Sequence, residues 1–227
     1  MSAFAQVAFS WDWDYALRVL PDIARGLWQT ILATLVGISI GMVLGLLLAL
    51  LRRSRVRVIR WPTIAFIEFV RSTPLLVQLF FIFFVFPGFG LVLSPFVTLV
   101  VGLGIHYGTY TSESYRAGIE NVERGQWEAA TALNLSAATT WSRIVLPQAI
   151  PTVIPALGNY LVAMFKDAPL GFAVAAGGIL LAAQSEASRS FRPIEPFTLM
   201  GVLFLAVSIP AAFFVRYLER RYGYERA

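Results

Sequence analysis

The stretch LWQTILATLVGISIGMVLGLLLALL, Leu27 to Leu51, holds 25 residues and no charged side chain. A hydrocarbon core about 30 Å thick requires roughly 20 apolar residues in an α-helix, so this stretch predicts a membrane-spanning helix. The segment RRSRVRVIR, Arg52 to Arg60, follows it directly and contains five arginines and no acid. An uncharged span that ends in an arginine cluster is typical of an integral membrane protein.

The composition supports the same class. Hydrophobic residues make up 58% of the 227 residues, charged residues make up 14%, and the mean hydropathy is +0.71; soluble domains carry about 25% charge. The chain has no cysteine, which excludes disulfides and thiolate metal sites. The net charge of +5 does not indicate nucleic-acid binding, because the arginines gather beside apolar runs. A short cleavable signal peptide is not expected, because the first 25 residues contain Asp12, Asp14, Arg18, Asp22 and Arg25.

The remaining apolar segments predict an all-α membrane protein with five spans. The uncharged region from Ser72 to Ser112 is too long for one crossing, and FPGFGLVLSP, Phe86 to Pro95, divides it with two prolines and two glycines. Gly171 to Ala183 is too short to cross and is expected to be interfacial or re-entrant. We expect a single domain over residues 1–227, with spans at about 24–51, 62–86, 95–116, 151–167 and 196–217.

Five spans place the two termini on opposite sides of the membrane. The Arg52–Arg60 loop, the region around Gly125 and the arginine-rich C-terminal tail then share one side, which the positive-inside rule predicts to be cytoplasmic. The N-terminus, with Asp12, Asp14 and Asp22, is expected outside. The Arg52–Arg60 cluster is interpreted as a topology determinant that contacts lipid headgroups.

Residues for catalysis are missing from the sequence. Lys166 is the only lysine and does not follow a glycine-rich loop, so the chain cannot form a P-loop. His106 is the only histidine and belongs to no metal-binding or nucleophile motif; we interpret it as a packing residue. We therefore expect no enzymatic activity, no metal and no cofactor, and any energy from ATP must come from another chain.

One segment is too polar for the bilayer. GQWEAATALNLSAATTWSRIVLPQAI, Gly125 to Ile150, contains alanines, threonines and two charged residues. A helix through it would place small residues on one face, Asn134 tolerates the left-handed backbone that ends a helix, and Ser136 suits the start of the next helix. We interpret the segment as a docking surface for a soluble partner, with a small-residue face formed by Ala129, Ala130, Leu133 and Ala137.

The spacing within this segment resembles a known family motif. EAATALN…IVLP, Glu128 to Pro147, is similar to the EAA loop of ABC-importer permeases, which reads EAA, three residues, Gly, nine residues and Ile-x-Leu-Pro. The one departure is Asn134 in place of glycine. The segments Phe66–Phe84 and Tyr110–Ala130 resemble the branch that transports polar amino acids, and the resemblance extends over about residues 24–218.

Within that branch the chain looks most like ectoine and hydroxyectoine permeases. TYTSESYRAG, WEAATALNLS and PALGNYLVAMFKDAP carry this narrower resemblance, whereas APLGFAVAAGG from Ala168 departs from the usual Thr-Pro-Leu-Leu.

The resemblance implies a type-I transmembrane domain in a bacterial inner membrane. Its partners would be two ABC ATPase subunits, a second permease that is identical or paralogous, an extracellular binding protein and membrane lipid. In the family the EAA helix lies in a cleft of the ATPase and transmits its closure. The residues that the resemblance assigns to ATPase coupling are Gly125, Glu128, Ala129, Ala130, Leu133, Asn134, Leu146 and Pro147.

Ionisable and polar side chains at membrane depth are candidates for the substrate path. Glu68 and Arg71 have i,i+3 spacing and are either a structural ion pair or part of the path. Gln78 needs a partner inside its span, and helix packing is one such role. Lys166 and Asp167 end the fourth span; the lysine either extends to the interface or binds a substrate carboxylate. A zwitterion also needs an acid or an aromatic face, which Asp167, Glu68 or the tyrosines Tyr107, Tyr110 and Tyr160 could supply.

Two other functions remain open from the residues alone. A stand-alone channel or secondary transporter for small zwitterions would give flux without nucleotide. A membrane scaffold would give none.

Overall fold

The computed structural model describes residues 11–222, and helices are the regular secondary structure of this part of the chain. Residues 1–10 and 223–227, the two ends of the expected 1–227 domain, lie outside it. The elements are α1 (Trp13–Arg52), α2 (Arg57–Arg71), α3 (Leu75–Phe80), η1 (Phe81–Val85), η2 (Phe86–Phe89), α4 (Pro95–Glu120), α5 (Arg124–Ala132), α6 (Ala137–Thr140), η3 (Trp141–Val145), α7 (Leu146–Asp167), η4 (Ala168–Val174), α8 (Ile179–Ser190) and α9 (Ile194–Tyr222).

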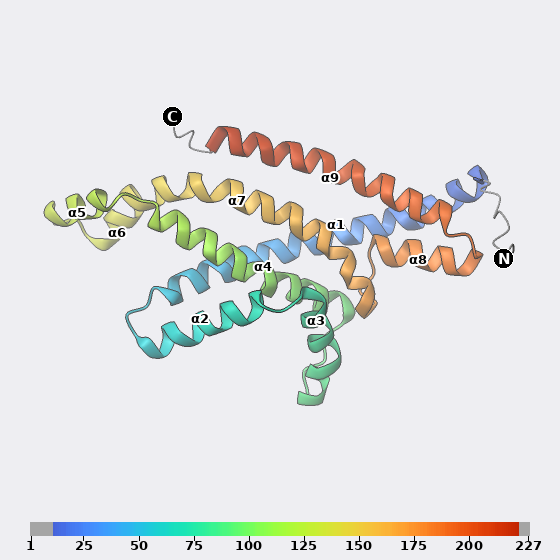
Figure 1. Cartoon of the computed structure of the whole chain (residues 1–227), viewed down its shortest axis with the longest axis horizontal. Helices are drawn as coiled ribbons and strands as arrows, with labels where there is room; N and C mark the ends of the chain where they lie inside the picture. The colour runs from blue at the N-terminus through green and yellow to red at the C-terminus, as the bar shows by residue number, and fades with distance from the viewer. Residues whose placement is uncertain (1–10, 223–227) are drawn as a thin grey trace, which may run out of the picture.

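The long helices form an elongated bundle. α1 packs along α4, α4 along α7, and α7 along α9, while α8 and α9 both contact α1. In Figure 1 the short helices α5 and α6 lie at one end of the bundle, together with the connection between α1 and α2, and α8 lies at the other end. The α3 segment projects sideways from the bundle.

Glycines allow α1 and α4 to approach closely. Gly41 and Gly45 of α1 face Gly108 of α4, and the Thr111 hydroxyl donates to the Gly41 carbonyl at 2.9 Å. A Cβ atom at Gly45 would lie 2.8 Å from the Gly108 carbonyl oxygen, which leaves no room for a side chain. Small residues at four-residue spacing are the usual means by which membrane helices pack without a hydrophobic driving force.

Length and composition mark three helices as able to cross a membrane: α1, the continuous segment from α6 to η4, and α9. A fourth crossing is added if the bent pair of α2 with α3–η2 counts as one. α4 has 26 residues but is not among them, because its second half carries His106, Tyr110 and several hydroxyl groups. α1 is also longer than expected, with 40 residues from Trp13 instead of a start near residue 24.

The span expected at 62–86 is not straight. α2 ends at Arg71, and the helices on either side of the break meet at 108°. Thr73 precedes Pro74, and the ring of a proline disfavours the helical conformation of the residue before it. The apolar content of the segment suggested one crossing, but the proline placed a corner in its middle.

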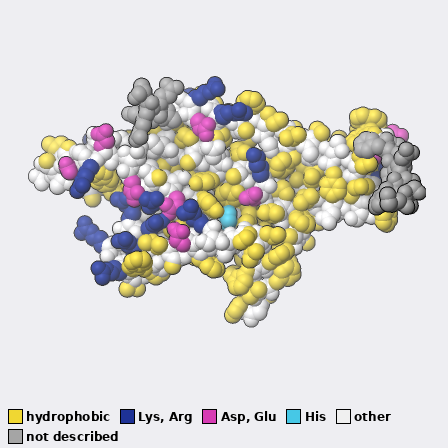
Figure 2. Space-filling model, in the orientation of Figure 1, with side chains coloured by type: hydrophobic (Ala, Val, Ile, Leu, Met, Phe, Trp, Pro, Cys, Tyr) yellow, Lys and Arg dark blue, Asp and Glu magenta, His cyan; other side chains and the backbone are white. Residues whose placement is uncertain are grey.

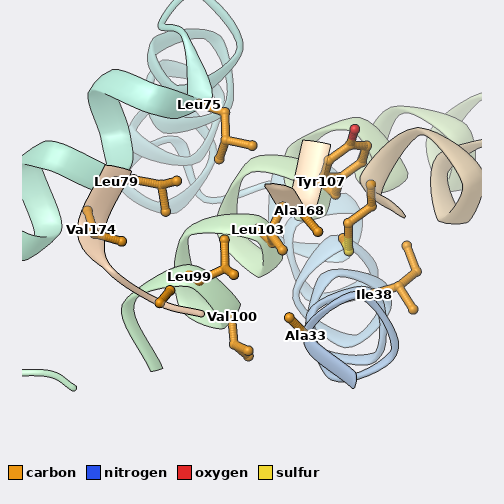
Figure 3. Close-up of a cluster of buried hydrophobic side chains, with 12 residues drawn as sticks. Ala33, Ile38, Leu75, Leu79, Leu99, Val100, Leu103, Tyr107, Ala168 and Val174 are labelled. Atoms are coloured by element: carbon orange, nitrogen blue, oxygen red, sulfur yellow. The ribbon is translucent and has the colours of Figure 1, made fainter. Parts of the chain in front are cut away.

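The main hydrophobic core lies where α1, α3, α4 and η4 meet. Figure 3 shows Leu75 and Leu79 of α3 together with Leu99 and Leu103 of α4, and Val174 of η4 beside them. Leu79 and Leu103 have no exposed surface. The bent α3 segment is therefore fixed against α4, and this positions the polar residues that continue along α4.

The segment expected to be interfacial or re-entrant, 171–183, forms a 3-10 turn followed by the start of α8. Gly177 and Gly178 have φ angles of 83° and 95° between them. Two side chains of α1 then satisfy the first N–H groups of α8: Gln29 accepts from Gly178 and Thr30 accepts from Ile179, each at 3.0 Å. A helix start inside a membrane protein needs such internal partners.

A polar network joins the start of α1 to the start of α9. Glu195 is 1% exposed and accepts hydrogen bonds from Arg192 at 2.7 Å and from the Asp12 backbone N–H at 3.2 Å. Arg192 also pairs with the Asp12 carboxylate at 3.3 Å and lies over the Tyr15 ring. The buried carboxylate is thus compensated by a cation and a backbone donor.

Candidate functional site

The polar segment after α4 forms a helix with a defined end. α5 spans Arg124–Ala132, and Asn134 follows it with a φ of 51°. The Leu135 N–H donates to the Ala130 carbonyl and the Asn134 N–H to the Thr131 carbonyl, each at 3.0 Å. This bonding pattern is the Schellman helix end, in which the left-handed residue is normally glycine or asparagine. Asn134 therefore adopts the turn that was expected of it.

The next helix also begins as expected. The Ser136 hydroxyl accepts from the Thr139 N–H at 3.2 Å and caps α6. Because the turn at Asn134 separates the two helices, Ala137 belongs to α6 and not to the face of α5.

The expected small-residue face of α5 is divided between two environments. Ala130 is 2% exposed and packs inward, whereas Ala129 and Glu128 are exposed and Leu133 is 71% exposed. The expectation that Ala129, Ala130, Leu133 and Ala137 form one docking face is therefore wrong for Ala130 and Ala137. The face open to a partner is the one that carries Glu128, Ala129 and Leu133.

Two tryptophans attach α5 to the rest of the bundle. Trp127 and Trp141 contact edge to face, with ring centroids 5.7 Å apart. Both pack on a small core of Ile119 in α4, Val122 just after α4, Val145 at the end of η3 and Ala149 in α7. A displacement of α5 would therefore act directly on these two long helices.

A cleft of about 620 Å³ lies between α5 and the start of α7. Gln126 contributes from α5, and Pro147 and Gln148 from α7. Pro147 is exposed in the lining of the cleft, and Leu146, the residue before it, is exposed too. Gly125 has open space around the position that a Cβ would occupy.

A second group of polar side chains gathers in the middle of the bundle. The Tyr107 hydroxyl on α4 donates to the Asp167 carboxylate at the end of α7, at 2.7 Å. The ring of Tyr160 lies 6.3 Å from that of Tyr107 and 6.0 Å from that of Tyr110. The structure thus brings Asp167 and the three tyrosines together.

The Gln78 side chain forms hydrogen bonds at the break between α2 and α3. Its amide nitrogen donates to the Val70 carbonyl at 2.8 Å, to the Thr73 carbonyl at 3.1 Å and to the Thr73 hydroxyl at 2.8 Å. Its amide oxygen lies 3.2 Å from Nδ1 of His106. Gln78 thus adds a side-chain donor to backbone carbonyls at the break, of which the Val70 carbonyl also accepts from Thr73. The centroid of the His106 ring also lies 5.2 Å from that of the Tyr110 ring. His106 therefore lies between the α2–α3 break and the tyrosines.

The two cations expected on the substrate path differ in placement. The Arg71 guanidinium lies 5.3 Å from the centre of the Tyr110 ring, a cation–π distance. Glu68 is exposed and, within residues 11–222, forms no ion pair with Arg71, so of the two alternatives left open for these residues the structural ion pair is wrong. Lys166 is exposed and makes no hydrogen bond or ion pair in this part of the chain.

The arrangement combines groups of both charges with aromatic faces. Asp167 supplies an anion, Arg71 a cation, and Tyr107, Tyr110 and Tyr160 the rings. No group of His, Cys, Asp and Glu among residues 11–222 could hold a metal ion. The cluster therefore places a carboxylate and three aromatic rings together, with a guanidinium against one of the rings.

Comparisons with known proteins show the family of the chain. Residues 41–224 match the family model described as "Binding-protein-dependent transport system inner membrane component". The chain is 41% identical to a probable amino-acid ABC transporter permease protein, y4tG, of Sinorhizobium fredii, over 93% of this chain and 94% of that protein. It is 36% identical to the L-cystine transport system permease protein TcyB of Bacillus subtilis, over 80% and 78% of the two chains.

A solved structure has the same fold. The crystal structure of an amino acid ABC transporter with histidines contains a chain that is 30% identical, with a TM-score of 0.87 over 93% of this chain and 99% of that one. The all-helical bundle described above is thus the fold of a membrane permease. The family match covers most of the sequence, and the chain belongs to the inner membrane components of binding-protein-dependent transport systems.

Proposed function

We propose that this chain is the permease subunit of an ATP-driven importer for a polar, amino-acid-like solute. The observation that carries the proposal is the cluster of Asp167, Arg71 and three tyrosines inside a chain of this family. The relatives named for amino acids and for cystine support the same class of solute. Ectoine and hydroxyectoine, which the sequence motifs suggested, are zwitterions of that class and belong among the solutes to be tested.

The solute is recognised through its two charges. Arg71 binds the carboxylate, and Asp167 with the faces of Tyr107 and Tyr110 binds the positive end. Lys166 remains a second candidate for the carboxylate, because it is adjacent to Asp167. Gln78 keeps the α2–α3 corner in place, and Glu68, exposed on α2, lies at the margin of the path.

Coupling to ATP requires other subunits, since this chain contains no P-loop lysine. The exposed face of α5, with Glu128, Ala129 and Leu133, contacts an ABC ATPase subunit. Gly125 is open to the same approach, and Ala130 and Asn134 give α5 its packing and its end. Pro147 lines the cleft between α5 and α7, and Leu146 precedes it at the start of α7, where a movement of α5 reaches that helix.

Other partners complete the transporter. The α3–η2 arm projects from the bundle with Phe81 52%, Phe84 64% and Phe89 82% exposed, and a second permease, identical or paralogous, covers it. An extracellular or periplasmic binding protein delivers the solute.

The chain crosses the membrane five times. One of these crossings is α4, whose polar side chains lower its hydropathy below that of the other spans. The spans are those expected at about 24–51, 62–86, 95–116, 151–167 and 196–217, within one domain over 1–227. Figure 2 shows most Lys and Arg side chains toward the end of the molecule that carries α5 and the α1–α2 connection. This end is cytoplasmic by the positive-inside rule, with the C-terminus on the same side and the N-terminus outside.

The orientation can be tested with single cysteines, because the chain has none of its own. Val56 is 54% exposed in the α1–α2 connection, and Val92 is 76% exposed between η2 and α4. We expect an impermeant maleimide added to intact cells to label a cysteine at position 92. A cysteine at position 56 should react only after the cells are permeabilised. The reverse pattern would place α5 on the wrong side for an ATPase and overturn the coupling proposal.

The function itself is tested by reconstitution. We expect affinity purification of this chain to recover an ABC ATPase, identified by mass spectrometry. Proteoliposomes that hold the complex and the binding protein should accumulate a labelled zwitterionic solute only when ATP is supplied. Flux without nucleotide would favour a stand-alone channel or secondary transporter, and the absence of flux under all conditions would favour a scaffold.

A further inference from the structure

A basic pocket lies between the end of α1, the start of α2 and the second half of α4. It measures about 300 Å³ and is lined by Arg52, Arg53, Arg60, Ile64, Arg116 and Glu120. It is separate from the polar cluster around Asp167 and from the cleft beside α5. Four of its six lining residues are arginines, so the pocket is built for an anion.

Two of these arginines are neutralised inside the protein. Glu113 accepts from Arg52 and, at 2.8 Å, from Arg116, and Glu120 pairs with Arg116. Arg53 and Arg60 are exposed, and within residues 11–222 neither lies within ion-pair distance of an acid. The four guanidinium groups therefore exceed the two carboxylates by two positive charges.

The two helices that supply Arg52 and Arg60 to the pocket also carry exposed apolar side chains close to these arginines in the sequence. On α2, Val58 is 82%, Ile59 42% and Trp61 62% exposed, and on α1 Leu50 is 48% and Leu51 44% exposed. A free ion would use none of this surface, and an acidic protein segment would leave most of it uncovered. A ligand that joins a phosphate to hydrocarbon chains covers both the charges and the apolar side chains.

We propose that this pocket binds the phosphodiester of an anionic phospholipid. Arg53 and Arg60 hold the phosphate oxygens, and Trp61 lies at the level of the glycerol backbone, where tryptophan is favoured in membranes. The acyl chains follow the exposed leucines of α1. Arg116 and Arg52, each held by a carboxylate, form the rear wall of the pocket.

The site is connected to the α5 loop. The Arg53 guanidinium lies 5.8 Å from the centre of the Trp141 ring, and Trp141 packs against Trp127 of α5. A lipid phosphate on Arg53 thus lies one side chain away from the tryptophan pair that attaches α5 to the bundle.

The test uses the full chain in complex with its ATPase, in nanodiscs with equal amounts of phosphatidylglycerol and phosphatidylcholine. Native mass spectrometry counts the lipids that remain bound. We expect the wild type to retain phosphatidylglycerol selectively and the Arg53→Gln, Arg60→Gln double variant to lose this preference by roughly thirtyfold, since each arginine contributes about fivefold at an anionic surface. The double variant Arg18→Gln, Arg25→Gln has the same change in charge at the other end of α1 and should retain the preference.

Three results would overturn the proposal. An equal loss in both double variants would mean diffuse attraction without a site. Release of phosphatidylglycerol by excess inorganic phosphate, with no preference for the lipid, would mean a site for free phosphate. Loss of the ATPase with lipid retained would mean that an acidic protein segment is the occupant. Arg60→Gln alone breaks no side-chain hydrogen bond or ion pair of residues 11–222, so it should show a fivefold effect in a folded protein even if the double variant is unstable.

Discussion

Ala129→Trp is expected to lower solute-stimulated ATP hydrolysis by the assembled transporter roughly fivefold to 150-fold, while the chain still inserts into the membrane. Ala129 is exposed on α5 beside Glu128 and Leu133, so an indole at this position projects into the partner and not into the bundle. Overpacking of a close contact costs about 1–3 kcal/mol, which corresponds to a loss of roughly fivefold to 150-fold in productive docking. The measurement is the ATPase rate of purified complex with and without solute and binding protein.

Two variants separate docking from folding. Ala206→Trp places the same indole on an exposed position of α9 and should leave stimulation unchanged. Ala130→Trp enlarges a side chain that is 2% exposed, so it should lower the thermal stability of the chain as well as the ATPase rate. Normal stimulation in both Ala129→Trp and Ala130→Trp would remove α5 from the coupling pathway.

Asp167→Asn is expected to lower ATP-driven solute uptake by about 10-fold to 150-fold without loss of the ATPase subunits. The substitution keeps the shape of the side chain and removes the charge that pairs with the positive end of the solute. Hydrogen bonds to charged groups contribute about 1.5–3 kcal/mol, which sets this range. Initial rates of uptake in proteoliposomes, with assembly checked by size-exclusion chromatography, measure the effect.

Two other variants that remove a charge show whether the loss of uptake is specific to Asp167. Asp14→Asn changes an exposed acid at the start of α1 and should leave uptake intact. Lys166→Ala is expected to weaken uptake without disturbing assembly if Lys166 shares the carboxylate with Arg71. Unchanged kinetics in Lys166→Ala would leave Arg71 as the carboxylate-binding cation, and loss of assembly would mark Lys166 as structural. Wild-type uptake in Asp167→Asn would contradict the proposed site.

Patterns in the sequence located several elements because the physics behind them is local. The uncharged run Leu27–Leu51 has to be a helix in lipid, since all of its backbone groups must be paired internally. Asn134 and Ser136 mark the end of α5 and the start of α6 through bonds to residues within a few positions. The spacing from Glu128 to Pro147 identified the family that the comparisons show.

Other features were visible in the sequence but could not be interpreted from it. Gly37, Gly41 and Gly45 have the four-residue spacing of a close helix contact, as do Gly104 and Gly108. The pattern indicates that each of the two helices packs closely against another helix. Only the fold shows that α1 and α4 pack against each other. Trp127 and Trp141 are a similar case. Their contact attaches α5 to the bundle, but their spacing in the sequence does not predict it.

The sequence by itself determined the membrane class, the helical content, the family and the local ends of the α5 loop, because these depend on burial in lipid and on hydrogen bonds between near neighbours. Only the tertiary structure decided the rest. It turned span 62–86 through 108° at Pro74, buried Ala130 while leaving Ala129 exposed, and replaced the Glu68–Arg71 pair by a contact of Arg71 with Tyr110. It also joined Tyr107 to Asp167 across 60 positions. These outcomes depend on which helix faces pack together. The energy of such contacts comes from pairs of residues that are distant in the chain, so no local sequence pattern predicts them.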